Sequence, residues 1–434
     1  MPSAGGASGF SWTIVWLLFF ATTINYIDRT VFGILGPLLQ GEFRWSEVEY
    51  SRMIMAFQLT YAIGYAGAGR LLDRIGVRAG YPLVVGIWSL AAMAHGMVAL
   101  LPPQARVALW GGNSTLAVVL AFGAARAVLG LAQGGNFPAA MKTVTEWFPK
   151  EQRALATGLF NSGSNAGAIV CPLLVPALYA ACGWSGAFYI TGAAGLLWLA
   201  AWWKLYPADR ASRPAVPALS AAPPEPAIPW LRLLGLRQTW MFLVGMCGSA
   251  PVWWFYIFWG PKFLNRHFHL DLQGSSLPLT LIFLGAVLGG IVAGWMTSAL
   301  LRRGWSLNAA RKIALLACAL GAVPVCAVPF LDNVWGAVAL LMLAAGAHCG
   351  FAANLYPLVG DLFAPEYAAS VTGIGGMAGS LVALAFAEVA GRLLNVGEVN
   401  YRLLFAGCAA SYVFAVGIMH ALSPRLEPVR QPQP

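Results

Sequence analysis

The sequence predicts an all-α polytopic membrane protein with twelve transmembrane helices arranged in two six-helix bundles, and two observations predict it. Of the 434 residues, 59% are hydrophobic and only 10% are charged, whereas an average soluble domain has roughly 25% charged residues. The mean hydropathy is +0.70, and apolar stretches of about 20 residues, long enough to cross a bilayer as a helix, recur from Trp12 to Leu422. Because these stretches are continuous rather than alternating, they disfavour a transmembrane β-barrel.

The apolar stretches fall into two groups of six. The first group is expected at 12–37, 49–69, 79–101, 116–140, 154–180 and 184–205. The second is expected at 238–263, 275–300, 309–330, 334–358, 367–391 and 402–422. Between them, residues 213–229 contain six prolines among alanines and are not expected to form a helix. We therefore predict an N-terminal bundle (1–206), a cytoplasmic Pro/Ala-rich linker (207–236) and a C-terminal bundle (237–434).

The distribution of lysine and arginine predicts the orientation in the membrane. With both termini in the cytoplasm, 17 of the 26 basic residues lie in cytoplasmic segments, 7 in external segments and 2 within spans. This topology and anionic lipid headgroups explain the net charge of +10, so no nucleic-acid partner is expected. The first span holds Asp28 and Arg29, unlike a cleavable signal peptide. We expect a monomeric multi-pass protein of the plasma (inner) membrane.

Cysteine and histidine patterns do not indicate a metal site. The seven cysteines lie in or at the ends of apolar stretches and lack the close pairs that metal sites use. His267, His269 and Asp271 form an H-x-H-x-D sequence at a helix end, which we interpret as a solvated loop. No nucleophile with its base lies in the spans, so we expect neither an enzyme nor a cofactor.

The loop between the second and third spans carries a spaced motif. Residues 69–78 read G-x-L-x-D-R-x-G-x-R. The first glycine would permit close helix contact, the acid could pair with an arginine or a helix N-terminus, and the second glycine would permit a tight turn. We expect five positions to act in gating: Gly69, Asp73, Arg74, Gly76 and Arg78. The motif resembles the signature loop of the major facilitator superfamily, and 294–304 after the eighth span resembles a degraded copy without the acid.

Further stretches carry specific patterns, namely Asn25–Arg29, Asn136–Lys142, Glu146–Pro149, Arg153–Gly158, Asn161–Gly163 and Asn354–Phe363. Together they resemble the anion:cation symporter family of that superfamily, specifically its hexuronate and aldonate (sugar acid) transporters. The resemblance covers essentially the whole chain. It implies the major facilitator fold and transport by alternating access.

The resemblance also implies roles for particular residues. Asp28, the acid of the first span, would take up a proton, and Arg29 and Arg126 would engage the substrate carboxylate. Tyr61 lies where the family contacts its substrate. The family places a second proton-carrying glutamate seven residues after the arginine of the fourth span, where this chain has Gln133. A glutamine cannot titrate, although it can bond sugar hydroxyls, so Asp28 is left as the evident deep carboxyl.

The buried charges require an explanation even without the resemblance. A charged side chain at a helix centre costs roughly 2.5 to 3.5 kcal/mol, so Asp28, Arg29 and Arg126 should face a wet cavity or one another. Structural ion pairing is one explanation. However, two arginines against one carboxylate leave a positive charge that an anionic substrate would neutralise. Arg126 and Gln133 are seven residues apart and should lie on one stripe, whereas Asp28 and Arg29 should point about 100° apart.

Other polar residues in the spans are candidates for binding substrate hydroxyls, namely Tyr61, Asn161, Asn165, Tyr256, Asn354 and Thr372. Each could instead bond a neighbouring helix. Gly130 and Gly134, near the stripe of the fourth span, could admit a ligand or pack against a helix. His348 in the tenth span could replace the missing titratable group, or could be a hydrogen-bonded structural residue.

These observations predict a secondary transporter that imports a small organic anion, a hexuronate or an aldonate, with a proton. With Gln133 in place of a glutamate, we expect one proton per monoanion, which makes transport electroneutral. A facilitator or anion exchanger without proton coupling is the main alternative. A sensor or receptor that does not transport is disfavoured because the loops are too short for a signalling domain.

Overall fold

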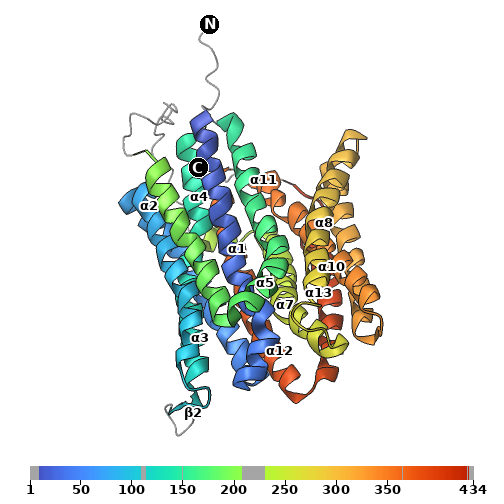
Figure 1. The fold of residues 1–434 in the computed structure, drawn as a ribbon. Helices are drawn as coiled ribbons and strands as arrows, with labels where there is room; N and C mark the ends of the chain where they lie inside the picture. Colours follow the sequence, from blue (N-terminus) through green and yellow to red (C-terminus); the bar gives the residue numbers. More distant parts are fainter. Residues whose placement is uncertain are drawn as a thin grey trace. The chain divides into compact units, whose positions relative to one another are not determined.

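The chain divides into two compact units, Met1–Ala222 (unit 1) and Pro223–Pro434 (unit 2). The computed structural model describes residues 9–108, 114–148, 150–207, 230–363, 365–427 and 429, and Figure 1 shows that they are overwhelmingly helical. The predicted linker, 207–236, spans the boundary between the units. Its residues 208–229 lie outside the described part, and a short helix, α6 (Trp230–Leu234), occupies part of the remainder.

Unit 1 contains five long or medium helices and one small hairpin. Its elements are α1 (Gly9–Phe43), α2 (Glu47–Met97), the 3₁₀ turn η1 (Val98–Leu100), β1 (Arg106–Ala108), β2 (Ser114–Leu116), α3 (Ala117–Gln133), α4 (Asn136–Trp147) and α5 (Lys150–Leu205). The backbone bends at Gly76 in α2 and at Gly183 in α5, where φ is +73° and +72°. α2 and α5 therefore contain two crossings each. With α1 as one crossing and α3 with α4 as another, this unit has six.

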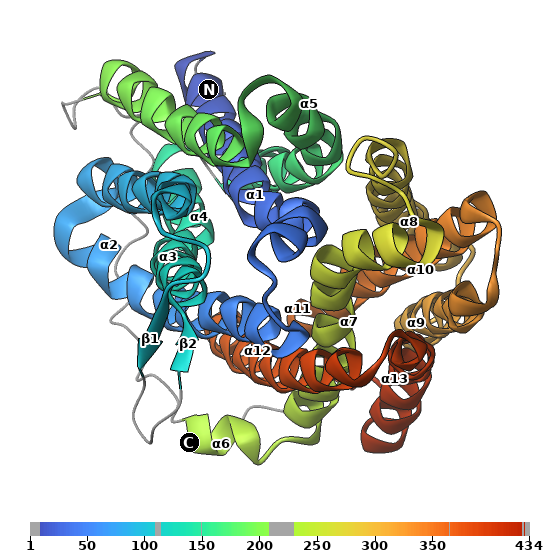
Figure 2. The ribbon, with the colours of Figure 1, turned by 60° about the horizontal axis from the view of Figure 1, so that its bottom comes forward.

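The antiparallel hairpin of β1 and β2 was not predicted. It pairs Arg106 with Leu116 and precedes α3 (Figures 1 and 2). The Thr115 hydroxyl donates to Glu49 Oε1 at 3.1 Å, which ties the hairpin to the first turn of α2. Glu49 also completes a capping box with Ser46 at that helix start. Strands of three residues are too short to give a period-2 pattern in the sequence.

Unit 2 contains the other six crossings. Its elements after α6 are α7 (Arg237–Phe268), α8 (Ser276–Arg302), α9 (Leu307–Ala322), the 3₁₀ segment η3 (Val323–Phe330), α10 (Val334–Leu355), α11 (Pro357–Leu362), α12 (Pro365–Val396), η4 (Glu398–Asn400) and α13 (Tyr401–Leu422). The third crossing of this unit ends as η3 because Pro324 and Pro329 have no backbone N–H to donate. α10 and α11 together form the fourth crossing.

The helices meet the requirements of a bilayer. Within the described residues, nine helical segments are long and apolar enough to cross a membrane, and one of them, Leu155–Leu205, contains both crossings of α5. Large apolar side chains point outward: Leu197, Ile291 and Phe414 are 74%, 64% and 69% exposed. Such a surface suits hydrocarbon rather than water. The fold is the predicted all-α, twelve-helix membrane architecture.

Glycines set the closest helix contacts in unit 1. A Cβ atom at Gly130 of α3 would overlap the Phe57 carbonyl oxygen of α2, and one at Gly134 would lie 2.6 Å from the Tyr61 carbonyl oxygen. On the other side of the unit, a Cβ at Gly163 of α5 would overlap the backbone of α1. Packing of small residues is a main source of helix association in membranes. Gly130 and Gly134 therefore serve helix packing, the second of the two roles that the sequence left open.

The chain after α13 bonds to other helices of unit 2. Lys312 of α9 donates to the carbonyl oxygen of Ser423 at 2.7 Å. The amide of Val429 donates to the carbonyl oxygen of Leu362, at the end of α11, at 2.8 Å. This tail, of which residues 423–427 and 429 are described, bonds to α9 and to the end of α11.

We expect Gly130→Ala to lower the apparent unfolding temperature in detergent. The added methyl group must push α3 away from the Phe57 carbonyl, and overpacking of this kind costs about 1–3 kcal/mol. Gly123→Ala on the same helix is the matched control, because a Cβ there meets no described atom within 4 Å. The control should be neutral or slightly stabilising, since alanine is the better helix former. Equal stability of the two variants would contradict the packing role.

Candidate functional site

The candidate site begins with a polar turn in the middle of α1. Asn25, Asp28 and Arg29 are buried there, with 2%, 2% and 6% of their surfaces exposed. Asn25 and Arg29 are four residues apart on one face, and Arg29 Nη2 donates to Asn25 Oδ1 at 3.2 Å. Asp28 points about 100° away from Arg29. The helix thus presents a guanidinium on one face and a carboxyl group on another.

α3 places two polar side chains against this turn. Gln133 Oε1 accepts from Arg29 Nε at 3.3 Å, and Gln133 Nε2 donates to the carbonyl oxygen of Asn25 at 3.0 Å. Arg126, two turns earlier and fully buried, donates through Nη1 to the carbonyl oxygen of Arg29 at 3.3 Å. The spacing of seven residues puts both side chains on the stripe of α3 that faces α1. Arg29 and Arg126 are called the arginine pair below.

Aromatic rings surround the arginine pair. The guanidinium carbon of Arg29 lies 4.7 Å from the ring centroid of Tyr61 and 5.5 Å from that of Phe57. The guanidinium carbon of Arg126 lies 4.4 Å from the centroid of Phe57 and 4.9 Å from that of Phe32. The faces of such rings attract cations, by about 0.5–2 kcal/mol each. These rings and amides are neutral, so they stabilise the two positive charges without cancelling them.

Asp28 faces α5 instead of the arginine pair. Its carboxyl group lies beside the hydroxyl of Thr191 and the thiol of Cys171, both on α5. Among the described residues, neither carboxylate oxygen has a hydrogen bond of ordinary geometry. The site therefore holds two guanidinium groups on one side of α1 and a carboxyl group on another. Their summed charge is positive whether or not the carboxyl group carries a proton, so the site favours a small anion.

The other residues predicted to bind hydroxyls are not all brought to the arginine pair. Tyr61 lies over Arg29, as described above. Asn161 and Asn165 are exposed on α5 of unit 1. The remaining three belong to unit 2, with Tyr256 on α7, Asn354 on α10 and Thr372 on α12.

Asn354 is bonded to neighbouring helices of unit 2. Its Oδ1 accepts from Thr297 of α8 at 2.5 Å, and its Nδ2 donates to the carbonyl oxygen of Gly350, one turn earlier in α10 itself, at 2.9 Å. Arg311 of α9 lies 3.5 Å from the same Oδ1 and forms an ion pair with Asp361 of α11 at 2.9 Å. In this structure the side chain of Asn354 makes the helix contacts that the sequence offered as its alternative role.

His348 also makes contacts within unit 2. Its Nδ1 lies 2.6 Å from the hydroxyl of Tyr412, and its ring stacks on Trp253 with a centroid separation of 4.8 Å. Tyr412 is fully buried and lies near Tyr256. These contacts give His348 the structural role of the two that the sequence left open.

The predicted gating motif forms the bend within α2. Gly76 has φ +73° and ψ 162°, a conformation essentially restricted to glycine, so the predicted turn is present. The carbonyl oxygen of Leu72 accepts from Lys142 of α4 at 3.1 Å, and that of Arg78 accepts from Trp202 of α5 at 3.1 Å. The bend is thereby attached to two other helices of unit 1.

The remaining motif residues differ in their exposure and contacts. Arg74 is exposed, and the guanidinium carbon of Arg78 lies 5.7 Å from the ring centroid of Trp203. The side chain of Asp73 lies outside the described part of the chain. A Cβ at Gly69 would meet no described atom within 4 Å, so the close helix contact expected at this glycine is not found. The structure gives no packing reason for Gly69.

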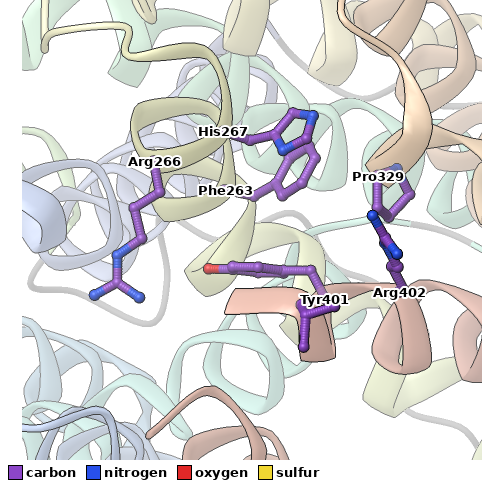
Figure 3. A pocket seen from close by; sticks show the side chains of 7 residues that line it. Phe263, Arg266, His267, Pro329, Tyr401 and Arg402 are labelled. Carbon is purple, nitrogen blue, oxygen red and sulfur yellow. The ribbon is translucent and has the colours of Figure 1, made fainter. Parts of the chain in front are cut away.

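A small cavity of about 170 Å³ lies in unit 2, and none of the predicted site residues lines it. Figure 3 shows the cavity, which is lined by the end of α7, the end of η3, the turn η4 and the start of α13. The lining residues are Phe263, Arg266, His267, Pro329, Val399, Tyr401 and Arg402. Small-molecule sites usually occupy about 300–1,000 Å³. The cavity is smaller than this and holds none of the predicted residues, so we place the site at the arginine pair.

Three residues at or beside the arginine pair were not predicted as site residues from the sequence, namely Asn25, Phe57 and Gln58. Asn25 appears in the sequence motif, and its spacing of four residues from Arg29 was an available signal. Phe57 gave no signal, because an aromatic residue in an apolar helix is unremarkable until its neighbours are known. Gln58, next to it, is a buried amide in the same helix. A polar residue among apolar ones was the signal for Gln58.

The fold and the buried polar site define a polytopic membrane transporter, and comparison with known proteins supports this class. The family model described as Major Facilitator Superfamily matches residues 18–387. The chain belongs to the Major Facilitator Superfamily.

Similar proteins include several transporters from Escherichia coli (strain K12). The hexuronate transporter is 27% identical over 411 residues, covering 92% of this chain and 90% of the relative. The probable L-galactonate transporter is 27% identical over 429 residues, covering 93% and 89%. Such relatives are transporters rather than enzymes.

Solved structures share the fold. A bacterial homologue of the human lysosomal transporter Spinster, in an inward-facing and occupied conformation, matches with a TM-score of 0.74 and 17% identity. That match covers 96% of this chain and 98% of the other. A D-xylose–proton symporter matches with a TM-score of 0.71 and 14% identity, covering 97% and 100%.

We expect Gly76→Ala to lower the apparent unfolding temperature in detergent. A side chain at this φ and ψ is strained by about 1–3 kcal/mol. Gly69→Ala in the same motif is the control, because its Cβ would meet no described atom. If Gly76→Ala unfolded at the same temperature as Gly69→Ala, the bend would not depend on glycine.

Proposed function

We propose that this protein imports a hexuronate or aldonate sugar acid together with a proton across the plasma (inner) membrane, with both termini in the cytoplasm. The observation that carries the proposal is the arginine pair, two guanidinium groups buried side by side on α1 and α3. The names of the relatives, which include hexuronate and galactonate transporters, support the class of substrate. We propose that the protein acts as a monomer in the lipid bilayer.

The arginine pair suits a carboxylate. A guanidinium group can donate two parallel hydrogen bonds to the two oxygens of a carboxylate, and such charged bonds are stronger in a medium of low dielectric. In the proposed complex Arg126 and Arg29 hold the carboxylate, while Tyr61 and Gln133 border it. The other residues proposed to bind hydroxyl groups are Asn161 and Asn165 in unit 1 and Tyr256, Asn354 and Thr372 in unit 2.

Asp28 supplies the proton in this proposal. With Asp28 ionised, it and the arginine pair sum to one positive charge. Protonation of Asp28 raises the sum to two, which strengthens the attraction of an anion at the pair. Binding of a monoanion returns the sum to one. The loaded and the empty site therefore carry the same charge, so one proton and one monoanion cross together without net charge movement.

Alternating access would deliver the substrate. The site would open to each side of the membrane in turn, and the substrate must bind the two states unequally in order to shift them. The motif at 69–78, bonded to α4 and α5, is the proposed gating element.

A facilitator or anion exchanger without proton coupling is the second candidate. It would keep Asp28 permanently ionised in a salt bridge with an arginine. The carboxyl group of Asp28 instead faces α5, where it lies beside the hydroxyl of Thr191, and the described residues show no ion pair between Asp28 and an arginine. This placement favours proton coupling.

We expect D-galactonate or D-glucuronate to raise the unfolding temperature of the wild-type protein in detergent, and Arg126→Ala to abolish the rise. Removing one partner of a buried charged pair costs about 2–5 kcal/mol, or about 30- to 5,000-fold in Kd. Arg402→Ala, at the cavity in unit 2, is the matched arginine control and should retain the rise. An unchanged rise in Arg126→Ala would remove this residue from the site.

We expect uptake by wild-type proteoliposomes to follow the pH difference and not the membrane potential. A second carboxyl group at position 133, next to Arg29, should change this. Gln133→Glu should gain potential-driven uptake, because a second proton would move with each monoanion and a charge crossing 100 mV is worth about 2.3 kcal/mol. Wild-type accumulation driven by potential at zero pH difference would contradict the proposed stoichiometry.

A further inference from the structure

Gln58 is a buried amide in α2 whose hydrogen-bonding groups are unused. Its side chain is 2% exposed, and neither Oε1 nor Nε2 has a partner among the described residues. Most buried polar side-chain atoms in proteins are hydrogen-bonded, and leaving one unbonded is unfavourable. An apolar residue of the same size would fit the position at lower cost. The amide therefore indicates a hydrogen-bonding partner that the surrounding chain does not supply.

Gln58 lies in α2 between two residues that contact the arginine pair. It follows Phe57, whose ring lies against both guanidinium groups, and precedes Tyr61, whose ring lies 4.7 Å from the guanidinium carbon of Arg29. In a helix, residues three apart differ by about 60° in direction and about 4.5 Å along the axis. Gln58 thus lies at the edge of the face of α2 that borders the proposed carboxylate site.

A second amide group without a hydrogen bond belongs to Asn25, which contacts Arg29 on α1. Asn25 Oδ1 accepts from Arg29, but Asn25 Nδ2 has no hydrogen-bond partner in the described part of the chain. Asn25 is also 2% exposed. Two amides, one on α1 and one on α2, therefore flank the arginine pair with unused hydrogen-bonding groups.

The chemistry of an amide matches that of a hydroxyl. The side chain of glutamine can donate through Nε2 and accept through Oε1 at the same time, as a pair of neighbouring hydroxyl groups requires. It carries no charge, so it would contribute less to holding a carboxylate than the two guanidinium groups do. It would instead distinguish a polyhydroxy acid from a carboxylate of similar length that lacks hydroxyl groups.

We propose that Gln58 is a specificity-determining residue that binds hydroxyl groups on the carbons nearest the substrate carboxylate. This inference rests on the proposed function, because it assumes that the arginine pair holds the carboxylate of a sugar acid. Sites built to hydrogen-bond a hydroxyl group reject analogues without it, since the protein groups are then left unbonded. Gln58 would supply this discrimination in unit 1.

The test compares wild type with Gln58→Met, a change to an unbranched apolar side chain of similar length. Affinity is measured in detergent for D-galactonate, for its 2-deoxy and 3-deoxy analogues and for hexanoate. We expect Gln58→Met to weaken D-galactonate binding by about 10- to 100-fold, the range for one or two lost hydrogen bonds. If Gln58 acts only through one hydroxyl, the deoxy analogue that lacks this hydroxyl should bind wild type and variant equally, and the double-mutant cycle measures the coupling.

The unliganded unfolding temperature provides a second readout. Gln58→Met should be as stable as wild type or more stable, because it removes an unbonded buried amide. Gln40→Met is the matched control, since Gln40 Nε2 donates to the Trp45 carbonyl oxygen and to Glu47 at 3.1 and 2.9 Å. The control should lower the unfolding temperature without changing the preference among the four acids.

The outcomes separate the two proposals. If wild type binds none of the sugar acids, the proposed function fails and this inference fails with it. If wild type binds D-galactonate and Gln58→Met weakens all four acids equally, or none, only the inference is overturned. If Gln58→Met unfolds at a lower temperature than wild type, Gln58 is a structural residue. Gln58→Asn, which keeps the amide on a shorter side chain, should retain part of the preference for D-galactonate over the deoxy analogue.

Discussion

The arrangement of unit 1 depends on keeping two guanidinium groups out of water. Arg126 reaches the carbonyl oxygen of Arg29, and Gln133 fixes Arg29 from the same face of α3, so one helix orients both charges. Phe57 lies against both groups from α2. Gly130 allows α3 to approach the backbone of α2 at Phe57. The close packing of α2 and α3 therefore also positions the charges. A wider gap between these helices would move the ring of Phe57 away from the guanidinium group of Arg126.

Asp28 and Arg29 are neighbours on α1, but their side chains have different surroundings. Because successive residues of a helix point about 100° apart, Asp28 and Arg29 reach different surroundings although their Cα atoms are neighbours. Arg29 meets amides and rings, whereas Asp28 meets the hydroxyl and thiol of α5. In the proposed mechanism, this separation would allow a proton and an anion to occupy one helix turn without competing for the same atoms. Gln133 cannot titrate and bonds to Arg29 and Asn25, so in that mechanism it would assist anion binding only.

Local patterns in the sequence predicted the helices and part of the site. Hydropathy located the twelve crossings, the glycine at 76 predicted the bend, and the spacing of Arg126 and Gln133 predicted their shared stripe. The hairpin at 106–116 and the use of Asn354 in helix contacts depend on tertiary partners that no local pattern encodes. The position of Phe57 between the arginines is of the same kind. Gln58 was visible as a polar residue, but its lack of partners could be seen only in the folded chain.

The tail after α13 has a consequence for how unit 2 can change shape. Its hydrogen bonds fasten the ends of α9 and α11 to the last helix, and the ion pair of Arg311 with Asp361 joins α9 to α11 a second time. These three helix ends should therefore move as one rigid group. Displacing any one of them relative to the others would break several of these bonds. Substitutions at Lys312 or Arg311 would therefore loosen the contacts among α9, α11 and the tail.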